Sequence, residues 1–110
     1  MPFTRTRFES NGTRNTEYHY LPVERGYLMS AAVSTNDANS YGATVFACIT
    51  VEQTSESDHL VIATLCKGYI GLDNPIGWTG KLNLEDSMRV TLTTISEDLL
   101  QIDLGIITEV

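Results

Sequence analysis

The stretch MRVTLTTISEDLLQIDLGII, residues 88–107, decides the fold because it contains two long runs in which apolar and polar side chains alternate. The apolar side chains that share one face are Met88, Val90 and Leu92 in the first run, and Leu100, Ile102, Leu104 and Ile106 in the second. A period of two places alternate side chains on opposite faces of a β-strand, so each run predicts a strand with one buried face. The polar triplet Ser96-Glu97-Asp98 between the runs predicts a short turn, and therefore a β-hairpin.

The rest of the chain adds further strand-like runs and no helical period. Residues 41–51 alternate along their length, residues 26–33 are typical of a strand, and residues 59–66 are apolar on both faces. The last pattern predicts a strand that is covered on both sides. With about seven or eight strands, the chain is expected to be an all-β, antiparallel β-sandwich or jelly-roll-like fold. Strands that are apolar on both faces also indicate more sheet area than one copy covers, and hence oligomers.

Residues 1–25 differ in composition from residues 26–110, which form the predicted β-sandwich domain. The first segment carries four Arg and three Glu, a balance of +1, whereas the second carries three basic and eleven acidic residues, a balance of −8. The first segment is interpreted either as an edge hairpin or as an extended N-terminal arm that becomes ordered against a partner. Its candidate partner-binding residues are Phe3, Arg5, Arg7, Phe8, Tyr18 and Tyr20.

Charge and composition exclude several classes of protein. The net charge of −7 repels phosphate backbones, so we expect no direct contact with nucleic acid. No run approaches the roughly 20 apolar residues that cross a bilayer, and the N-terminus lacks the apolar region of a secretory signal. We therefore expect a protein that is neither membrane-bound nor secreted. Cys48 and Cys66 lie in apolar runs, which favours buried, reduced thiols, with a disulfide between neighbouring strands as the alternative.

A search for catalytic chemistry finds no constellation that predicts an enzyme. The chain has two histidines, His19 and His59, and His59 follows Asp58. Neighbours in an extended strand point in opposite directions, so this adjacency does not make a catalytic dyad. The sequence contains no phosphate loop, no dinucleotide fingerprint and no metal-ligand spacing, so we expect no catalytic residues, no cofactor and no metal.

Trp78, the only tryptophan, follows a stretch rich in glycine and proline, residues 67–77, that is expected to be a long shaped loop. Its indole could cap the end of the sandwich, anchor a protein contact or stack on a sugar. Tyr69 is the only aromatic residue in the loop, and Tyr69 and Trp78 complete the candidate partner-binding set. A small carbohydrate-binding β-sandwich module that uses this loop is therefore the alternative function.

The C-terminal third carries a resemblance to a known class of protein. Residues 78–84, WTGKLNL, precede a short acidic turn, an alternating strand, a turn containing Asp98-Leu99 and a final strand. Over roughly the last 35 residues this arrangement resembles small virion structural proteins of tailed bacteriophages, in which a Trp-x-Gly-x-Leu-x-Leu stretch precedes the last hairpin.

The resemblance implies a non-enzymatic capsid decoration or cement protein, or a tail-associated protein. Its implied partners are further copies of itself, most often as a homotrimer, and the major capsid protein or another virion protein. The implied location is the virion, assembled in the host cytoplasm. Proteins of this class have no catalytic residues to transfer.

Overall fold

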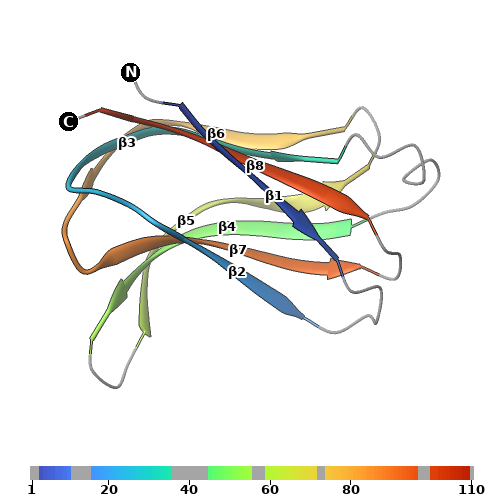
Figure 1. Ribbon diagram of the computed structural model, residues 1–110, viewed down its shortest axis with the longest axis horizontal. Coiled ribbons are helices and arrows are strands. Elements are labelled where there is room, and N and C mark those ends of the chain that lie inside the picture. Colours follow the sequence, from blue (N-terminus) through green and yellow to red (C-terminus); the bar gives the residue numbers. More distant parts are fainter. Residues whose placement is uncertain are drawn as a thin grey trace.

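The computed structural model describes residues 3–10, 16–35, 45–55, 59–71, 74–96 and 100–109, which form eight strands and no helix. The strands are β1 (Phe3–Glu9), β2 (Glu17–Pro22), β3 (Gly26–Ser34), β4 (Val45–Thr54), β5 (His59–Ile70), β6 (Ile76–Leu84), β7 (Met88–Ser96) and β8 (Gln101–Glu109). Two antiparallel sheets pack face to face (Figure 1): sheet A has the order β1-β8-β3-β6, and sheet B has the order β2-β7-β4-β5. The predicted all-β antiparallel sandwich is confirmed.

The core lies between the two sheets and consists of alternate side chains from the strands. Sheet A supplies Leu28, Ala31, Val33, Leu84, Ile102, Leu104 and Ile106, and sheet B supplies Val45, Ala47, Ile49, Val51, Ile70, Val90 and Leu92. Each of these side chains is exposed by 3% or less. Burying a Val, Leu or Ile side chain stabilises the fold by about 1.5–3 kcal/mol. The alternation in the sequence is therefore what brings the two sheets together.

The β-hairpin predicted for residues 88–107 was wrong, although both of its strands are present. β7 pairs with β2 and β4 in sheet B, whereas β8 pairs with β1 and β3 in sheet A. The chain thus crosses between the sheets after Ser96, and residues 97–99 lie outside the described part of the chain. Two strands of one hairpin and two strands in opposite sheets of a sandwich show the same alternation of apolar and polar residues. In the hairpin the buried side chains lie next to each other on one sheet, whereas in the sandwich they face each other across the core.

The N-terminal residues form neither the edge hairpin nor the separate arm that the sequence suggested. β1 pairs with β8 over seven residues at the edge of sheet A, and β2 pairs with β7 over six residues at the edge of sheet B. Phe8 of β1 and Leu21 of β2 pack against the core, which explains why both strands belong to the sandwich. Residues 11–15, between β1 and β2, lie outside the described residues.

The start of β5 was predicted to be covered on both sides, and this was wrong. β5 is the edge strand of sheet B, and Leu60, Val61 and Ile62 are exposed by 66%, 52% and 40%. The register between β4 and β5 shifts twice, between Ile49 and Thr50 and between Val51 and Glu52. Bulges of this kind bend an edge strand away from regular pairing with other chains, which limits aggregation at an exposed apolar edge.

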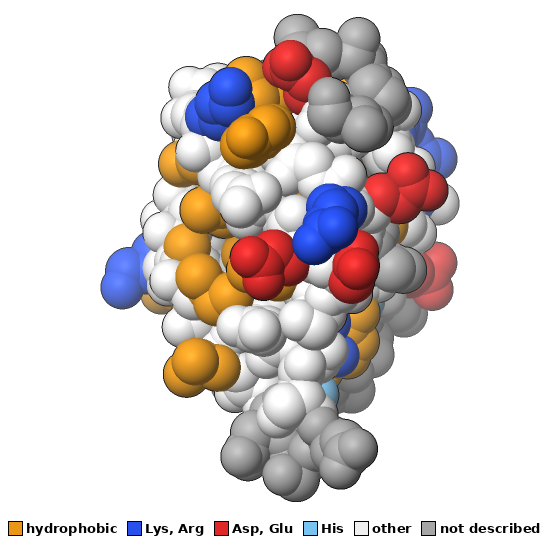
Figure 2. Space-filling view, turned by 90° about the vertical axis from the view of Figure 1, so that its left-hand side faces the viewer, with side chains coloured by type: hydrophobic (Ala, Val, Ile, Leu, Met, Phe, Trp, Pro, Cys, Tyr) orange, Lys and Arg blue, Asp and Glu red, His pale blue; other side chains and the backbone are white. Residues whose placement is uncertain are grey.

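Charged side chains of both signs lie at one end of the sandwich (Figure 2). Figure 2 shows this end, with Asp and Glu side chains over its middle and right and a band of hydrophobic side chains down its left. Glu85 and Asp86, between β6 and β7, are exposed. The described part of the chain contains no helix that is long and apolar enough to cross a membrane.

Candidate functional site

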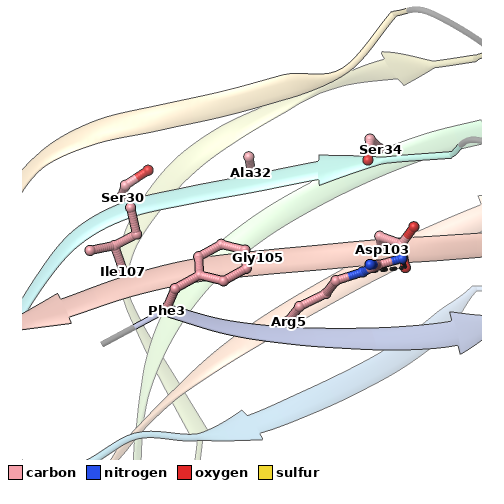
Figure 3. A pocket seen from close by; sticks show the side chains of 8 residues that line it. All are labelled: Phe3, Arg5, Ser30, Ala32, Ser34, Asp103, Gly105 and Ile107. Atoms are coloured by element: carbon pink, nitrogen blue, oxygen red, sulfur yellow. Dashed lines mark hydrogen bonds and ion pairs between the residues drawn. The ribbon is translucent and has the colours of Figure 1, made fainter. Parts of the chain in front are cut away.

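A pocket of about 280 Å³ lies on the outer face of sheet A, where β1, β8 and β3 run side by side (Figure 3). Its lining residues, together with the adjacent Arg7, form three cross-strand rows, which are Phe3–Ile107–Ser30, Arg5–Gly105–Ala32 and Arg7–Asp103–Ser34. These positions face outward because the alternate residues of β8, such as Ile102 and Leu104, are buried in the core. The volume is just below the range of about 300–1,000 Å³ that is typical of ligand sites.

The floor of the pocket has almost no side chains. Gly105 of β8 lies opposite Ala32 of β3, and Ala32 lies opposite Gly77 of β6. We call these three residues the groove floor, because together they form a low track across three strands. A Cβ atom added at Gly77 would be 3.2 Å from the carbonyl oxygen of Ala31, so a larger side chain there would also crowd the neighbouring strand.

One wall of the groove is apolar and consists of Phe3 and Ile107. The ring of Phe3 is 64% exposed and lies against Gly105. A Cβ atom added at Gly105 would be 3.1 Å from Cε2 and 3.2 Å from Cζ of this ring. The glycine therefore allows the aromatic ring to lie flat on the sheet, with its other side open to the solvent (Figure 3).

The opposite wall is charged and centres on Asp103. The Nε atom of Arg7 donates a hydrogen bond to Asp103 Oδ1 at 3.0 Å, and Arg5 donates to the same oxygen from Nε at 3.4 Å and Nη2 at 3.3 Å. The Asp103 side chain is 11% exposed, while the two arginine side chains are about half exposed, at 52% and 51%. The carboxylate thus fixes two guanidinium groups whose remaining donors face the solvent.

Three of the eight residues that the sequence predicted to bind a partner lie on the walls of the groove. Phe3 lies on the apolar wall, and Arg5 and Arg7 lie on the charged wall. Three others, Tyr18, Tyr20 and Tyr69, lie on the outer face of sheet B, on the far side of the molecule. The structure therefore divides the predicted set between two surfaces.

The outer face of sheet B has a row of large side chains that crosses all four strands. Phe46 lies opposite both Ile95 and Tyr69, and Tyr18 lies opposite Thr93, the next outward position on β7. We call Tyr18, Ile95, Phe46 and Tyr69 the aromatic stripe. The rings of Phe46 and Tyr69 are in edge contact, with centroids 5.5 Å apart and planes at 71°.

Beside the stripe, a cluster of polar groups is held together by Arg89. Its guanidinium lies 3.7 Å from the centre of the Tyr20 ring and donates to Glu52 Oε2 from Nη2 at 3.0 Å. Both ion-pair side chains are mostly covered, at 20% and 12% exposure. The charge of Glu52 is therefore neutralised within this face.

The last two predicted residues, Phe8 and Trp78, face the interior. Trp78 lies within strand β6 and not in a loop, opposite the buried Ala31, and it packs against the core. Its indole lies over Gly80, where an added Cβ would be 2.6 Å from Cζ2. Trp78 and Tyr69 belong to different sheets and different faces, so they do not form one platform.

The two histidines lie at opposite edges of sheet B, on β2 and β5. His19 stacks on Phe8 with ring centroids 4.3 Å apart, and its Nε2 is 3.7 Å from Glu17 Oε2. Burial lowers the pKa of His19, and the nearby Glu17 opposes this shift. His59 is exposed at the start of β5. This arrangement does not bring the two imidazoles together.

The cysteines are partly buried free thiols in adjacent strands. Burial raises the pKa of Cys48, and Lys67 opposes the shift; burial also raises the pKa of Cys66. A raised pKa keeps a thiol protonated and weakly nucleophilic at neutral pH. Among the described residues, no group of three or more His, Cys, Asp and Glu side chains is placed to hold a metal ion.

Most of the groove could not be identified from the sequence. Asp103 was noticeable as a charge inside an apolar alternating run, and Gly105 interrupts the same run two residues later. Ser30, Ala32 and Ser34 carry no comparable signal, because small side chains on a strand are compatible with many environments. Only the pairing of β1, β8 and β3 places these residues around one pocket.

No protein-family model and no curated protein sequence matches the chain. Solved structures of similar shape include the Yersinia pseudotuberculosis-derived mitogen, with a TM-score of 0.55, 10% identity, and coverage of 98% of this chain and 86% of the mitogen. This likeness shows a shared β-sandwich fold.

Two further structures match less well in shape. The C-terminal family 22 carbohydrate binding module of Clostridium thermocellum Xyn10B has a TM-score of 0.49, 13% identity, and coverage of 96% of this chain and 86% of the module. The nucleoplasmin-like N-terminal domain of Drosophila FKBP39 has a TM-score of 0.36, 12% identity, and coverage of 98% and 89%.

Proposed function

We propose that this chain is a non-catalytic binding module that holds a carbohydrate in the groove across the outer face of sheet A. The observation that carries the proposal is the contrast between the two walls of the groove. An exposed Phe3 ring lies flat on one side, and Asp103 with its two arginines lies on the other. Between them the floor has no side chain larger than a methyl group.

The two walls match the two chemistries of a sugar ring. A pyranose presents a face of C–H groups, which packs on an aromatic ring, and a rim of hydroxyl groups, which both donate and accept hydrogen bonds. Phe3 and Ile107 supply the apolar contact. Arg5 and Asp103 supply donors and an acceptor whose positions are fixed by their own ion pair. A preorganised site of this kind loses little side-chain entropy when a ligand binds.

The shape of the floor favours a chain of sugars over a single ring. Gly105, Ala32 and Gly77 continue the low track from β8 to the edge strand β6, beyond the pocket itself. A linear oligosaccharide placed across the strands would cover this track with its first unit against Phe3.

The lining residues favour binding without turnover. Among the described residues that line the pocket, Asp103 is the one carboxylate, and none is a histidine or a cysteine. Most glycoside hydrolases need a pair of carboxylates about 5–10 Å apart, one of which is free to exchange a proton. Asp103 is instead held in two ion pairs.

A glycan array followed by calorimetry on the best ligand tests the proposal. Phe3→Ala removes an exposed ring and should weaken binding about tenfold, since an aromatic contact contributes about 0.5–1.5 kcal/mol beyond area burial. Ala32→Leu fills the floor while leaving both walls in place, and it should abolish binding. The matched control is Tyr69→Ala on the opposite sheet, which should bind like the wild type.

Three results would contradict the proposal. Binding by Ala32→Leu at wild-type strength would show that the ligand does not enter the groove. Loss of binding in Tyr69→Ala would move the site to sheet B. Binding of extended peptides to this groove, with no glycan bound, would assign it to a different class of ligand.

A second candidate function is the structural role in a virion that the C-terminal resemblance implies, as an oligomeric decoration, cement or tail-associated protein. The observation that favours it is the aromatic stripe on sheet B, since exposed tyrosines are typical of protein interfaces. Mass spectrometry of purified particles tests this role, because a decoration protein is present in stoichiometric ratio to the capsid protein. Its absence from particles of a producing host would rule the role out.

A further inference from the structure

We infer that two copies of this chain associate face to face through the aromatic stripe on the outer face of sheet B. This inference does not depend on the proposed carbohydrate site, which lies on the outer face of the other sheet. Three features of sheet B carry it: its exposed aromatic side chains, its local charge and its area.

The first feature is the exposure of the stripe. Tyr69 is 65% exposed, Tyr18 is 58% exposed and Ile95 is 38% exposed, and Phe46 joins them across the centre of the sheet. Tyr20, at 48% exposure, extends the surface along β2. Tyrosine is enriched at the centre of protein interfaces because it buries a large area with few rotatable bonds.

The second feature is charge, which favours a second copy over an unrelated acidic or basic partner. The chain as a whole has a net charge of −7, so two copies repel each other over most orientations. The charged side chains that the strands of sheet B turn outward are Lys67, Arg89 and Glu52, which sum to +1. Glu52 is already paired with Arg89. This face is therefore one where two acidic copies can approach without bringing unpaired carboxylates together.

The third feature is area. Four strands about 4.8 Å apart, with about nine residues at 3.3 Å each, give a face of roughly 19 by 30 Å. The accessible surface of its side chains exceeds this flat area of roughly 570 Å². The flat area alone is about seven-tenths of the roughly 800 Å² that each partner buries in a stable interface. If a two-fold axis passes through this face, the aromatic stripe of one copy contacts the aromatic stripe of the other. The same surface then serves as the interface on both copies.

The sheet edge offers a different route to association, and the structure disfavours it. Leu60, Val61 and Ile62 at the start of β5 are exposed, but register shifts interrupt the pairing of β5 with β4 in this region. A bulged strand presents an irregular row of backbone donors and acceptors to a second chain. Leu60 therefore provides a control position outside the stripe.

Sedimentation velocity over about 1 μM to 500 μM tests the inference. The wild type should move from 12.2 kDa to twice that mass as concentration rises. Ile95→Glu and the double variant Tyr18→Ser/Tyr69→Ser should raise the dimer dissociation constant at least tenfold. Leu60→Lys on the edge and Phe3→Ala on sheet A should leave it unchanged.

A monomer throughout the concentration range would overturn the inference. So would a dimer that Leu60→Lys disperses and Ile95→Glu does not. A trimer would also overturn it, because a two-fold face-to-face contact closes at two copies.

Hydroxyl-radical footprinting of the wild type tests the same face-to-face association without any variant. Tyr18 and Tyr69 should become protected as concentration rises, while Phe3 stays reactive. Constant reactivity of both tyrosines would refute the inference even if the variants failed to fold. Retention of glycan binding by a monomeric Ile95→Glu would show that the two surfaces act independently.

Discussion

Replacing Asp103 with asparagine should destabilise the fold by about 1–2 kcal/mol. The side chain keeps its size but loses the charge that two guanidinium groups contact, at 3.0 Å from Arg7 and 3.3 Å from Arg5. Ion pairs at full exposure contribute about 0.2–1 kcal/mol, and hydrogen bonds to charged groups contribute about 1.5–3 kcal/mol when buried. Because Asp103 is covered while both arginines are half exposed, we assign about 0.5–1 kcal/mol to each arginine.

The consequence is measurable by thermal unfolding. An unfolding entropy of about 2.1 cal/mol/K per residue gives roughly 0.23 kcal/mol/K for a chain of this length, so Tm should fall by about 4–9 °C. Circular dichroism at 0.1 M salt measures it, and urea unfolding gives the free energy directly. Glu109→Gln, which neutralises an exposed carboxylate on the same strand, should shift Tm by less than about 2 °C. Equal shifts in the two variants would refute the reasoning, because net charge and not the arginine contacts would then be responsible.

Three further changes test other parts of the structure. Thr91 is fully buried and its hydroxyl has no hydrogen-bond partner, so Thr91→Val should raise the free energy of unfolding in urea by about 1 kcal/mol; a loss would show that the hydroxyl is satisfied. Burial lowers the pKa of His19 below its ordinary 6.5 despite the opposing charge of Glu17, so the unfolded chain binds protons more readily. Its contribution to stability should be complete above about pH 6.5 and decline as the pH falls towards the lowered pKa; His19→Phe should flatten the urea-derived stability between pH 7.5 and 5.5, and an unchanged slope would contradict the assignment. Leu92→Ala creates a cavity in the core and should cost about 3–4 kcal/mol in the same assay, whereas a cost below 1 kcal/mol would mean that the site collapses.

The fold class followed from the sequence because alternation depends only on which side chains are buried. Val90 and Leu92 in one strand and Ile102 and Leu104 in another are all buried as the pattern indicated. The pairing of these strands did not follow, since the same pattern serves two neighbours in one sheet or two strands that face each other across a core. The exposure of Leu60 was missed for a related reason: apolar composition predicts a covered strand, and the edge position of β5 is a property of the topology.

The candidate site was predictable only in part. Phe3, Arg5 and Arg7 were selected because they stood out in a polar segment; the structure places Phe3 and Arg5 in the lining of one pocket, and Arg7 contacts its lining residue Asp103. The other half of the groove comes from β8 and β3, whose contribution depends on a pairing between distant parts of the chain. Asp103 could be noticed in the sequence as a charged residue within an apolar run. The role of Gly105 could not, because it depends on the space that the missing side chain leaves for the Phe3 ring.

The pairing of β1 with β8 has a consequence for how the proposed binding groove forms. Among the six strand pairings of the described residues, only β4–β5 joins strands that are consecutive in the chain. Folds dominated by such distant pairings close large loops before they gain contacts, and they fold in milliseconds to seconds. The Phe3 wall and the Asp103 wall come together only when the β1–β8 ladder forms (Figure 1), so the proposed binding groove requires the pairing of the two ends of the described chain and is not contained in the β4–β5 pair.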